Sequence, residues 1–307
     1  MSDYKKQHYI PEFYLKAWCD PSSPQDYEPY LWIASKDGSN IKPKAPSNIF
    51  HETDLYTIKI DGKRDLSIEK NLAQIEGEFS DIRRNKLEKH LMLNIQDKII
   101  ICAFAAAMYS RTLANGERWK PIWNDVANQT ADIMRKFTEW RENATPEQLE
   151  SYIPSMSSKD SSVITYEEIK EVADEPLKLL IPTQFKILIP LFLKLDLAII
   201  ETSTSPGFIT SDDPCVWFDS QLPNYSRLAG RALISPTIEI HLPISPSQCI
   251  FLSRRGEKGY INLSNFGPLR EIKSVTEVNW RTRMKSNKYF IVNKKIILAK
   301  WFTFYQS

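Results

Sequence analysis

The amino-acid sequence predicts an α+β fold, in which three or more long helices form a core packed on a mixed or antiparallel sheet. Two observations indicate this class. Apolar residues recur at helical spacing through the middle of the chain, whereas short runs rich in β-branched and aromatic residues lie towards both ends. With 307 residues, of which 42% are hydrophobic, the chain can bury a sizeable core. We therefore expect one α+β domain over residues 1–307.

The N-terminal part, residues 1–65, is expected to form small strands. It begins with the run "HYIPEFYLKAW" (residues 8–18) and continues with "YLWIAS" (30–35) and "DLYTIKI" (54–60). Both later runs are apolar and β-branched, and Asp61-Gly62 after the second is typical of a turn.

Residues 66–142 are predicted to form the helical core. The first helix begins near Leu66, because apolar residues recur at steps of four and three on one face. Asn94 and Asp97 cap the second helix, which is apolar on every side. A third helix, from about Arg118 to Arg141, carries a long stripe. The stripe comprises Trp119, Trp123, Val126, Ile133, Phe137 and Trp140.

The remaining segments complete the predicted order. Residues 143–176 are polar and contain two helix starts, at Thr145-Pro146 and Thr165-x-x-Glu168, which indicates a surface insertion or lid. Residues 177–307 are β-rich after a proline-interrupted apolar stretch. Their predicted strands are "LAIIETS", "GFITSD", "TIEIHLPIS", "QCIFLSR" and the closing run "KYFIVNKKIILAKWFTFY", with a helix at "SVTEVNWRTRMKSN" before the last.

Charge and cysteine content narrow the function classes. Lys plus Arg is 40 and Asp plus Glu is 38, so the net charge of +2 gives no general attraction to nucleic acid or membrane. The four cysteines lie far apart, which is typical of reduced thiols in a cytoplasmic protein. No apolar run reaches the roughly 20 residues of a membrane span. The phosphate-loop, dinucleotide, serine-elbow and zincin motifs are all absent, so no nucleotide cofactor is expected.

His8 is the first candidate for chemistry. If a helix starts at Pro11, the positive helix end would lower the pKa of His8 and favour a neutral imidazole that can act as base or metal ligand. The alternative is that His8 makes a local hydrogen bond that closes the N-terminus.

The run "FITSDDPCVW" (208–217) displays polar residues at the end of a strand. Two adjacent carboxylates, Asp212 and Asp213, can bind a divalent cation or a cationic group, or can cap neighbouring backbone with Ser211. Because consecutive side chains near a strand diverge, we expect only one of the two aspartates to face the interior.

Arg111 ends the apolar helix, on the same face as Phe104 and Met108. A buried guanidinium needs an anion, which we expect to be Asp212, a helix carboxylate or a bound ligand. Glu69 and Glu76 flank the stripe of the first helix, where glutamates are usually solvated.

These motifs together resemble a widespread bacterial and phage-associated family of domains of unknown function. The resemblance rests on "HYIPEFYLKAW", "IEKNLAQIEGEF", "AFAAAMYSRT", "FITSDDPCV" and "LPISPS", and covers His8 to about Val292. Met108 and Leu113 depart from it, where members commonly have glutamine and proline. It implies one shared design that includes His8, Tyr14, Glu76, Arg111, Ser211, Asp212 and Pro214.

Two functions follow as hypotheses. The first is a hydrolase, and more specifically a metal-dependent nuclease or toxin effector in bacterial anti-phage defence. Its catalytic residues would be His8, Arg111 and Asp212, supported by Tyr14, Glu76, Ser211 and Asp213. Asp212 and Glu76 would then hold Mg²⁺ or Mn²⁺, with nucleic acid as substrate. The second is a non-catalytic binding or sensor subunit of a defence complex, acting through a protein partner or as a homo-oligomer. Heavy aromatic content, with 8 Trp, 13 Tyr and 14 Phe, favours this alternative.

Overall fold

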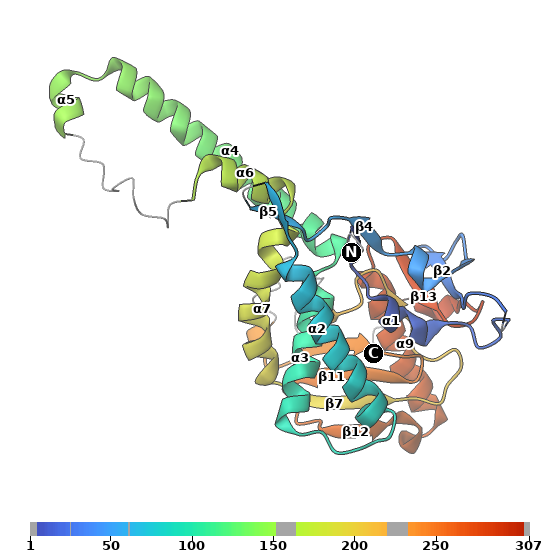
Figure 1. Ribbon diagram of the computed structural model, residues 1–307. Helices are drawn as coiled ribbons and strands as arrows, with labels where there is room; N and C mark the ends of the chain where they lie inside the picture. The colour runs from blue at the N-terminus through green and yellow to red at the C-terminus, as the bar shows by residue number, and fades with distance from the viewer. Residues whose placement is uncertain (1–4, 25, 61, 152–163, 220–232, 304–307) are drawn as a thin grey trace.

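Two sheets and a layer of helices make up the body of the protein (Figure 1). The computed structural model describes residues 5–24, 26–60, 62–151, 164–219 and 233–303. The fold is α+β, as the sequence predicts. Helices α2, α3 and α7 cover one side of the larger sheet, and α9 lies beyond the other side (Figure 1).

The larger sheet has five strands in the order β12-β7-β11-β10-β9. All pairs are antiparallel except β12 with β7, which are parallel. Every residue of β10, an interior strand between β11 and β9, is buried, because helices or loops cover both of its faces. The strand bounds are β7 Asp196–Glu201, β9 Val216–Asp219, β10 Ile238–Pro243, β11 Gln248–Ser253 and β12 Gly259–Asn262.

The smaller sheet joins the two ends of the chain. Its order is β3-β2-β13-β8, with every pair antiparallel. Ile33 of the N-terminal part faces Ile291 of the C-terminal part, and both are buried. This confirms the expected sheet built from both ends. The bounds are β2 Leu31–Ser35, β3 Lys42–Lys44, β8 Thr210–Ser211 and β13 Tyr289–Val292.

Two small hairpins complete the N-terminal part. The strand that contains His8 pairs antiparallel with the strand that contains His51, and a second pair lies just before α2. The elements are β1 Lys6–His8, β4 His51–Thr53, β5 Ile58–Ile60 and β6 Lys63–Asp65, with short 3-10 turns at Lys16–Trp18, Pro46–Asn48, Leu263–Phe266 and Ala299–Trp301.

The core lies where α3 packs between α2, α7 and the sheet. The capping box of Asn94 and Asp97 starts α3 as predicted, and the stripe of α2 faces the core. Phe79 of α2 stacks on Phe104 of α3 with ring centroids 3.8 Å apart. The bounds are α1 Glu12–Leu15, α2 Ser67–Ile82, a π-helical turn Arg83–Leu87, α3 Ile95–Ser110, α7 Leu177–Leu193 and α9 Pro268–Lys285.

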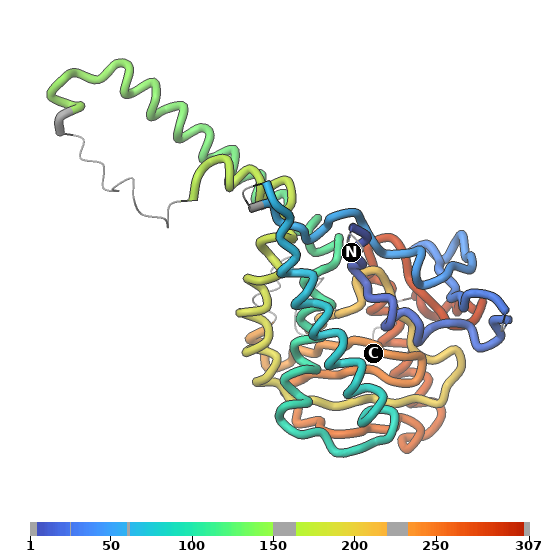
Figure 2. Tube along the Cα trace, viewed as in Figure 1, coloured from blue at the N-terminus to red at the C-terminus, as the bar shows by residue number. Residues whose placement is uncertain are grey.

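Three helices form an arm that projects from the body. Helix α4, Leu113–Asn143, runs outward, α5, Pro146–Ser151, lies at its far end, and α6, Tyr166–Asp174, lies along its near half (Figure 1 and Figure 2). The capping box of Thr165 and Glu168 is present as predicted. We call α4, α5 and α6 the arm. Residues 152–163 of the predicted insertion lie outside the described part of the chain.

The structure differs from the sequence prediction at three elements. Helix α4 begins at Leu113, because the side chain of Thr112 caps it by accepting from the amide of Asn115. The closing strands shrink to β13, followed by loops and a 3-10 turn. The interrupted apolar stretch is one helix, α7, which contains Pro182 and Pro190. Among the described residues, no single helix combines the length and apolar character needed to cross a membrane.

Gly207 is required where the chain turns into β8. Its φ is +77°, and a Cβ there would lie 2.1 Å from the carbonyl oxygen of Pro246. We expect Gly207→Ala to lower the free energy of unfolding by about 2–4 kcal/mol, because the left-handed backbone and the clash with main chain add together. Chemical denaturation measures this.

Gly77→Ala is the matched control. Gly77 lies in α2, and nothing is within 4 Å of the added Cβ. This alanine should raise the free energy of unfolding by about 0.5–1 kcal/mol. Equal effects of the two substitutions would contradict the role assigned to Gly207.

Candidate functional site

Arg111 holds the N-terminal strand against the helices. It lies at the C-terminal end of α3 and is only 2% exposed. Its guanidinium donates to the carboxylate of Glu76 and to the backbone carbonyl of His8. Its charged partner is thus a helix carboxylate, one of the expected alternatives, and not Asp212.

The surroundings of Arg111 favour its charged form. Burial is the largest influence and on its own would lower the pKa of Arg111, but the charges and hydrogen bonds of Glu76 and Tyr56 together outweigh it and raise that pKa. Tyr56 packs its ring 5.7 Å from the guanidinium and donates its hydroxyl to the carbonyl of Arg111 at 2.9 Å. Glu69 lies nearby on α2, and burial raises its pKa.

The imidazole of His8 points elsewhere. Its ring lies 5.2 Å from that of His51, and its buried Nε2 has no hydrogen-bond partner within the described residues. Burial, with smaller contributions from His51 and Lys6, lowers the pKa of His8 to about 4. The imidazole is therefore neutral at pH 7, and burial is the largest cause. The helix expected to start at Pro11 is α1, which has four residues and starts at Glu12.

Tyr14 anchors the N-terminal segment to both sheets. Its hydroxyl lies 2.5 Å from Oγ1 of Thr210 on β8 and donates to the carbonyl of Pro243 on β10 at 2.6 Å. The ring is fully buried against Trp18 and Phe104. These hydrogen bonds and ring contacts give Tyr14 a structural role.

Asp212 is a backbone clamp. Its carboxylate accepts hydrogen bonds from the amides of Asn287 (2.8 Å), Lys288 (2.7 Å) and Tyr289 (3.0 Å), where the chain leaves α9 and enters β13. Burial raises the pKa of Asp212 to about 6, although the three amides act in the opposite direction. Both carboxylate oxygens are thus occupied by main chain.

Asp213 forms a separate ion cluster. Its carboxylate accepts from Arg118 at 2.6 Å and from Thr112 at 3.3 Å, and Nζ of Lys285 lies 3.8 Å away. Its amide donates to the hydroxyl of Ser211 at 3.2 Å. Both aspartates are buried, so the expectation that only one faces the interior is wrong. The side chains do diverge, but protein groups lie on both sides of the turn.

The structure therefore divides the predicted residues into two clusters. Arg111, Glu76 and the carbonyl of His8 form one, and Asp212 and Asp213 with their partners form the other. Tyr9 follows His8 in the chain, and its pKa is raised by burial and then by the charge of Asp212. In the described part of the chain, no three His, Cys, Asp or Glu side chains are placed to hold a metal ion. Mg²⁺ or Mn²⁺ binding by Glu76 and Asp212 stays a prediction, which their present partners do not favour.

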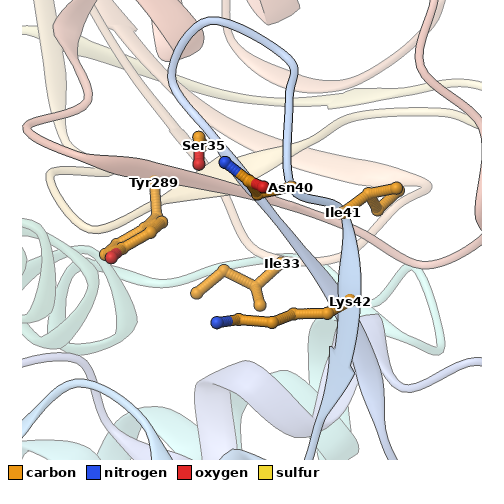
Figure 3. A pocket seen from close by; sticks show the side chains of 6 residues that line it. All are labelled: Ile33, Ser35, Asn40, Ile41, Lys42 and Tyr289. Atoms are coloured by element: carbon orange, nitrogen blue, oxygen red, sulfur yellow. The ribbon is translucent and has the colours of Figure 1, made fainter.

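A shallow cavity of about 350 Å³ lies on the smaller sheet (Figure 3). Six residues line it: Ile33, Ser35, Asn40, Ile41, Lys42 and Tyr289. None of them is a predicted site residue. Tyr289 connects the cavity to the clamp, since its amide is one of the three that Asp212 binds.

The arm carries the second candidate surface. Ile122, Val126 and Ile133 of α4 are 52%, 38% and 66% exposed. They recur at steps of four and seven, so they lie along one side of the helix. Ala127, on another side, is buried, and Trp123 is half-buried. We call Ile122, Val126 and Ile133 the arm strip. The sequence prediction places the stripe from Trp119 to Trp140 in the helical core. That prediction is wrong beyond the part of α4 that α6 covers.

A family model for proteins of unknown function, DUF4238, matches residues 6–294. The chain belongs to the DUF4238 family. The match spans almost the whole chain, including both polar clusters and the arm. None of the curated proteins and none of the solved structures compared with the chain matches it.

Sequence reasoning missed the cations that neutralise Asp213 in this DUF4238 chain. Arg118 is in the second turn of α4 and Lys285 is the last residue of α9, and both look like ordinary surface charges in the sequence. The one available signal for Arg118 was its place just after the Arg111-Thr112 helix end. No local pattern indicates Lys285, because only the tertiary fold brings it to the aspartate.

The Arg111 cluster has a testable energetic consequence. Glu76→Gln would leave a buried guanidinium without its anion, which we expect to lower the free energy of unfolding by about 2–4 kcal/mol. Glu78→Gln, on the exposed side of the same helix, should change it by less than about 0.5 kcal/mol. Urea denaturation of both variants measures the difference, and similar values would show that the ion pair does not hold the N-terminus.

Proposed function

We propose that the chain is a non-catalytic binding subunit that contacts a protein partner through the arm strip. The observation that carries this proposal is the exposure of Ile122, Val126 and Ile133 on a helix that projects from the body. Exposed apolar side chains aligned along one side of a projecting element are typical of a protein interaction site. Burying it against a partner removes apolar area from water, which is the main driving force of association.

The base of the arm is fixed to the body, whereas its outer half is exposed. At its base, Arg118 is ion-paired to Asp213 at 2.6 Å, and Gly116 packs on Leu177 of α7. Further out, α4 has exposed residues on every side from Ile133 to Asn143. The base thus orients the helix, and the outer half presents its side chains to a partner.

The polar residues predicted for catalysis support the same proposal. Arg111, Glu76 and Asp212 contact protein groups that join separate segments of the chain. These contacts hold the fold together and leave the same groups occupied. The hydrolase hypothesis and the defence setting stay predictions, and no observation among the described residues adds to them.

Photo-crosslinking tests the arm strip directly. A photoreactive phenylalanine analogue in place of Ile133 should give one discrete adduct in the native host cells. The same analogue at Asn128, five residues away and about 140° around the helix, should give none. Electrophoresis followed by mass spectrometry measures the adduct. Absence of any adduct at Ile133, or equal adducts at both positions, would refute the proposal.

The strip should matter for binding and not for folding. Ile133→Ser removes an exposed side chain, so we expect the free energy of unfolding to change by less than about 0.5 kcal/mol. Adduct formation from an analogue placed at Val126 should fall at least about tenfold in the same variant. A large loss of stability would mean that Ile133 packs within its own chain.

A nuclease assay separates the two hypotheses. The full chain is incubated with DNA and with RNA in Mg²⁺ or Mn²⁺, beside His8→Ala and Asp212→Ala, each checked for folding by circular dichroism. We expect no turnover above background, because the carboxylates of Glu76 and Asp212 already bind protein groups. Metal-dependent cleavage that His8→Ala abolishes in a folded protein would establish an enzyme instead.

A further inference from the structure

A row of carboxylates borders the arm strip. Asp125, Asp132 and Glu139 recur at every seventh residue of α4, and Asp125 and Asp132 directly precede Val126 and Ile133. Residues seven apart lie on the same side of a helix, so the three carboxylates form a line beside the apolar side chains. We call Asp125, Asp132 and Glu139 the acidic border.

The acidic border is accessible to a partner. The side chains of Asp132 and Glu139 are 43% and 58% exposed. Their present contacts are within α4: Arg135 binds both, at 2.5 and 2.8 Å, and Lys136 binds Asp132 at 2.6 Å. Exposed pairs of this kind contribute little to stability, so these carboxylates can exchange them for a partner's cations.

From Trp123 to Phe137 the residues on the other border of the strip carry no charge. Trp123, Thr130 and Phe137 follow the strip on that side, also at intervals of seven. The surface is therefore asymmetric, with an apolar centre, one acidic border and one uncharged border.

We propose that the arm strip binds an amphipathic helix whose apolar face is bordered by a row of lysines or arginines. This inference rests on the proposed function and names the partner of the same surface. Residues that border an apolar seam choose the partner of a helix pair through opposite charges. Gln129 and Lys136 lie within the line of the strip, and polar seam residues select one register at a cost in affinity.

The same geometry argues against a second copy of the chain. In an antiparallel pair of arms, each border faces the same border of the other helix, so the acidic border would oppose itself. In a parallel pair, it would face Trp123, Thr130 and Phe137, which supply no cation. Like charges at such positions are destabilising, whereas a basic border on a different helix is complementary.

A display library tests this partner chemistry. The probe is a set of helical peptides with a fixed apolar stripe, in which each border position encodes lysine or glutamate. Selection on the full chain should enrich peptides with a lysine border about tenfold over those with a glutamate border. The preference should weaken at high salt, because the contact is solvent-exposed.

Charge reversal on the arm provides the decisive variant. Asp125→Lys with Asp132→Lys should invert the preference towards the glutamate border. Asn124→Lys with Thr138→Lys adds two lysines to the far side of the same helix, away from the strip and from the acidic border, and should leave the preference unchanged. Circular dichroism checks that both double variants keep their helix content. An unchanged preference in the first variant would overturn the inference.

Two further readouts distinguish a failure of the basic-partner inference from a failure of the proposed function. Enrichment that Ile133→Ser abolishes, but that does not depend on border charge, would refute the basic partner and leave the proposed function standing. Enrichment that ignores Ile133→Ser would refute both. Analytical ultracentrifugation of the chain alone should show a monomer at micromolar concentration, and a dimer that Ile133→Ser dissolves would assign the strip to a second copy.

Discussion

The charge of Arg111, at the end of a helix apolar on every side, is the constraint on which the N-terminal half depends. A guanidinium that is 2% exposed must find acceptors within the protein. It takes one from α2, through Glu76, and one from β1, through the carbonyl of His8. Helix, strand and N-terminus are therefore joined at one cation. In the C-terminal half, the carboxylate of Asp212 joins segments in a similar way, because it accepts hydrogen bonds from three successive amides between α9 and β13.

Elements with a clear period were predictable from the sequence, and those set by tertiary contacts were not. The stripe of α2 and the capping boxes at Asn94 and Thr165 identify their helices because each signal lies within a few residues. The run after β13 is as apolar as a strand, yet its described residues form loops and a 3-10 turn, because the hydrogen-bond partners of a strand come from the tertiary fold and not from the run itself. Helix α7 keeps its two prolines because packing against α3 outweighs the hydrogen bonds they remove.

The candidate site shows the same limit. The sequence singles out Arg111 and the aspartate pair as buried charges that need partners, but it cannot name those partners. Glu76 looks solvated by its place beside a stripe, and its ion pair with Arg111 becomes evident only when α3 packs against α2. A stripe such as that of α4 predicts that something covers it. Periodicity does not say whether the cover belongs to the same chain, so the sequence alone places the stripe of α4 in the core.

The ion pair between Arg118 and Asp213 also determines where the far end of the arm points. Helix α4 has 31 residues, which at about 1.5 Å each makes it about 46 Å long. A rotation of about 5° at its base would move its tip by roughly 4 Å, close to one turn of a partner helix. The direction of the arm therefore depends on the buried carboxylate of Asp213, in the turn that follows β8. A contact inside the body thus sets the position of a binding surface that lies far from it.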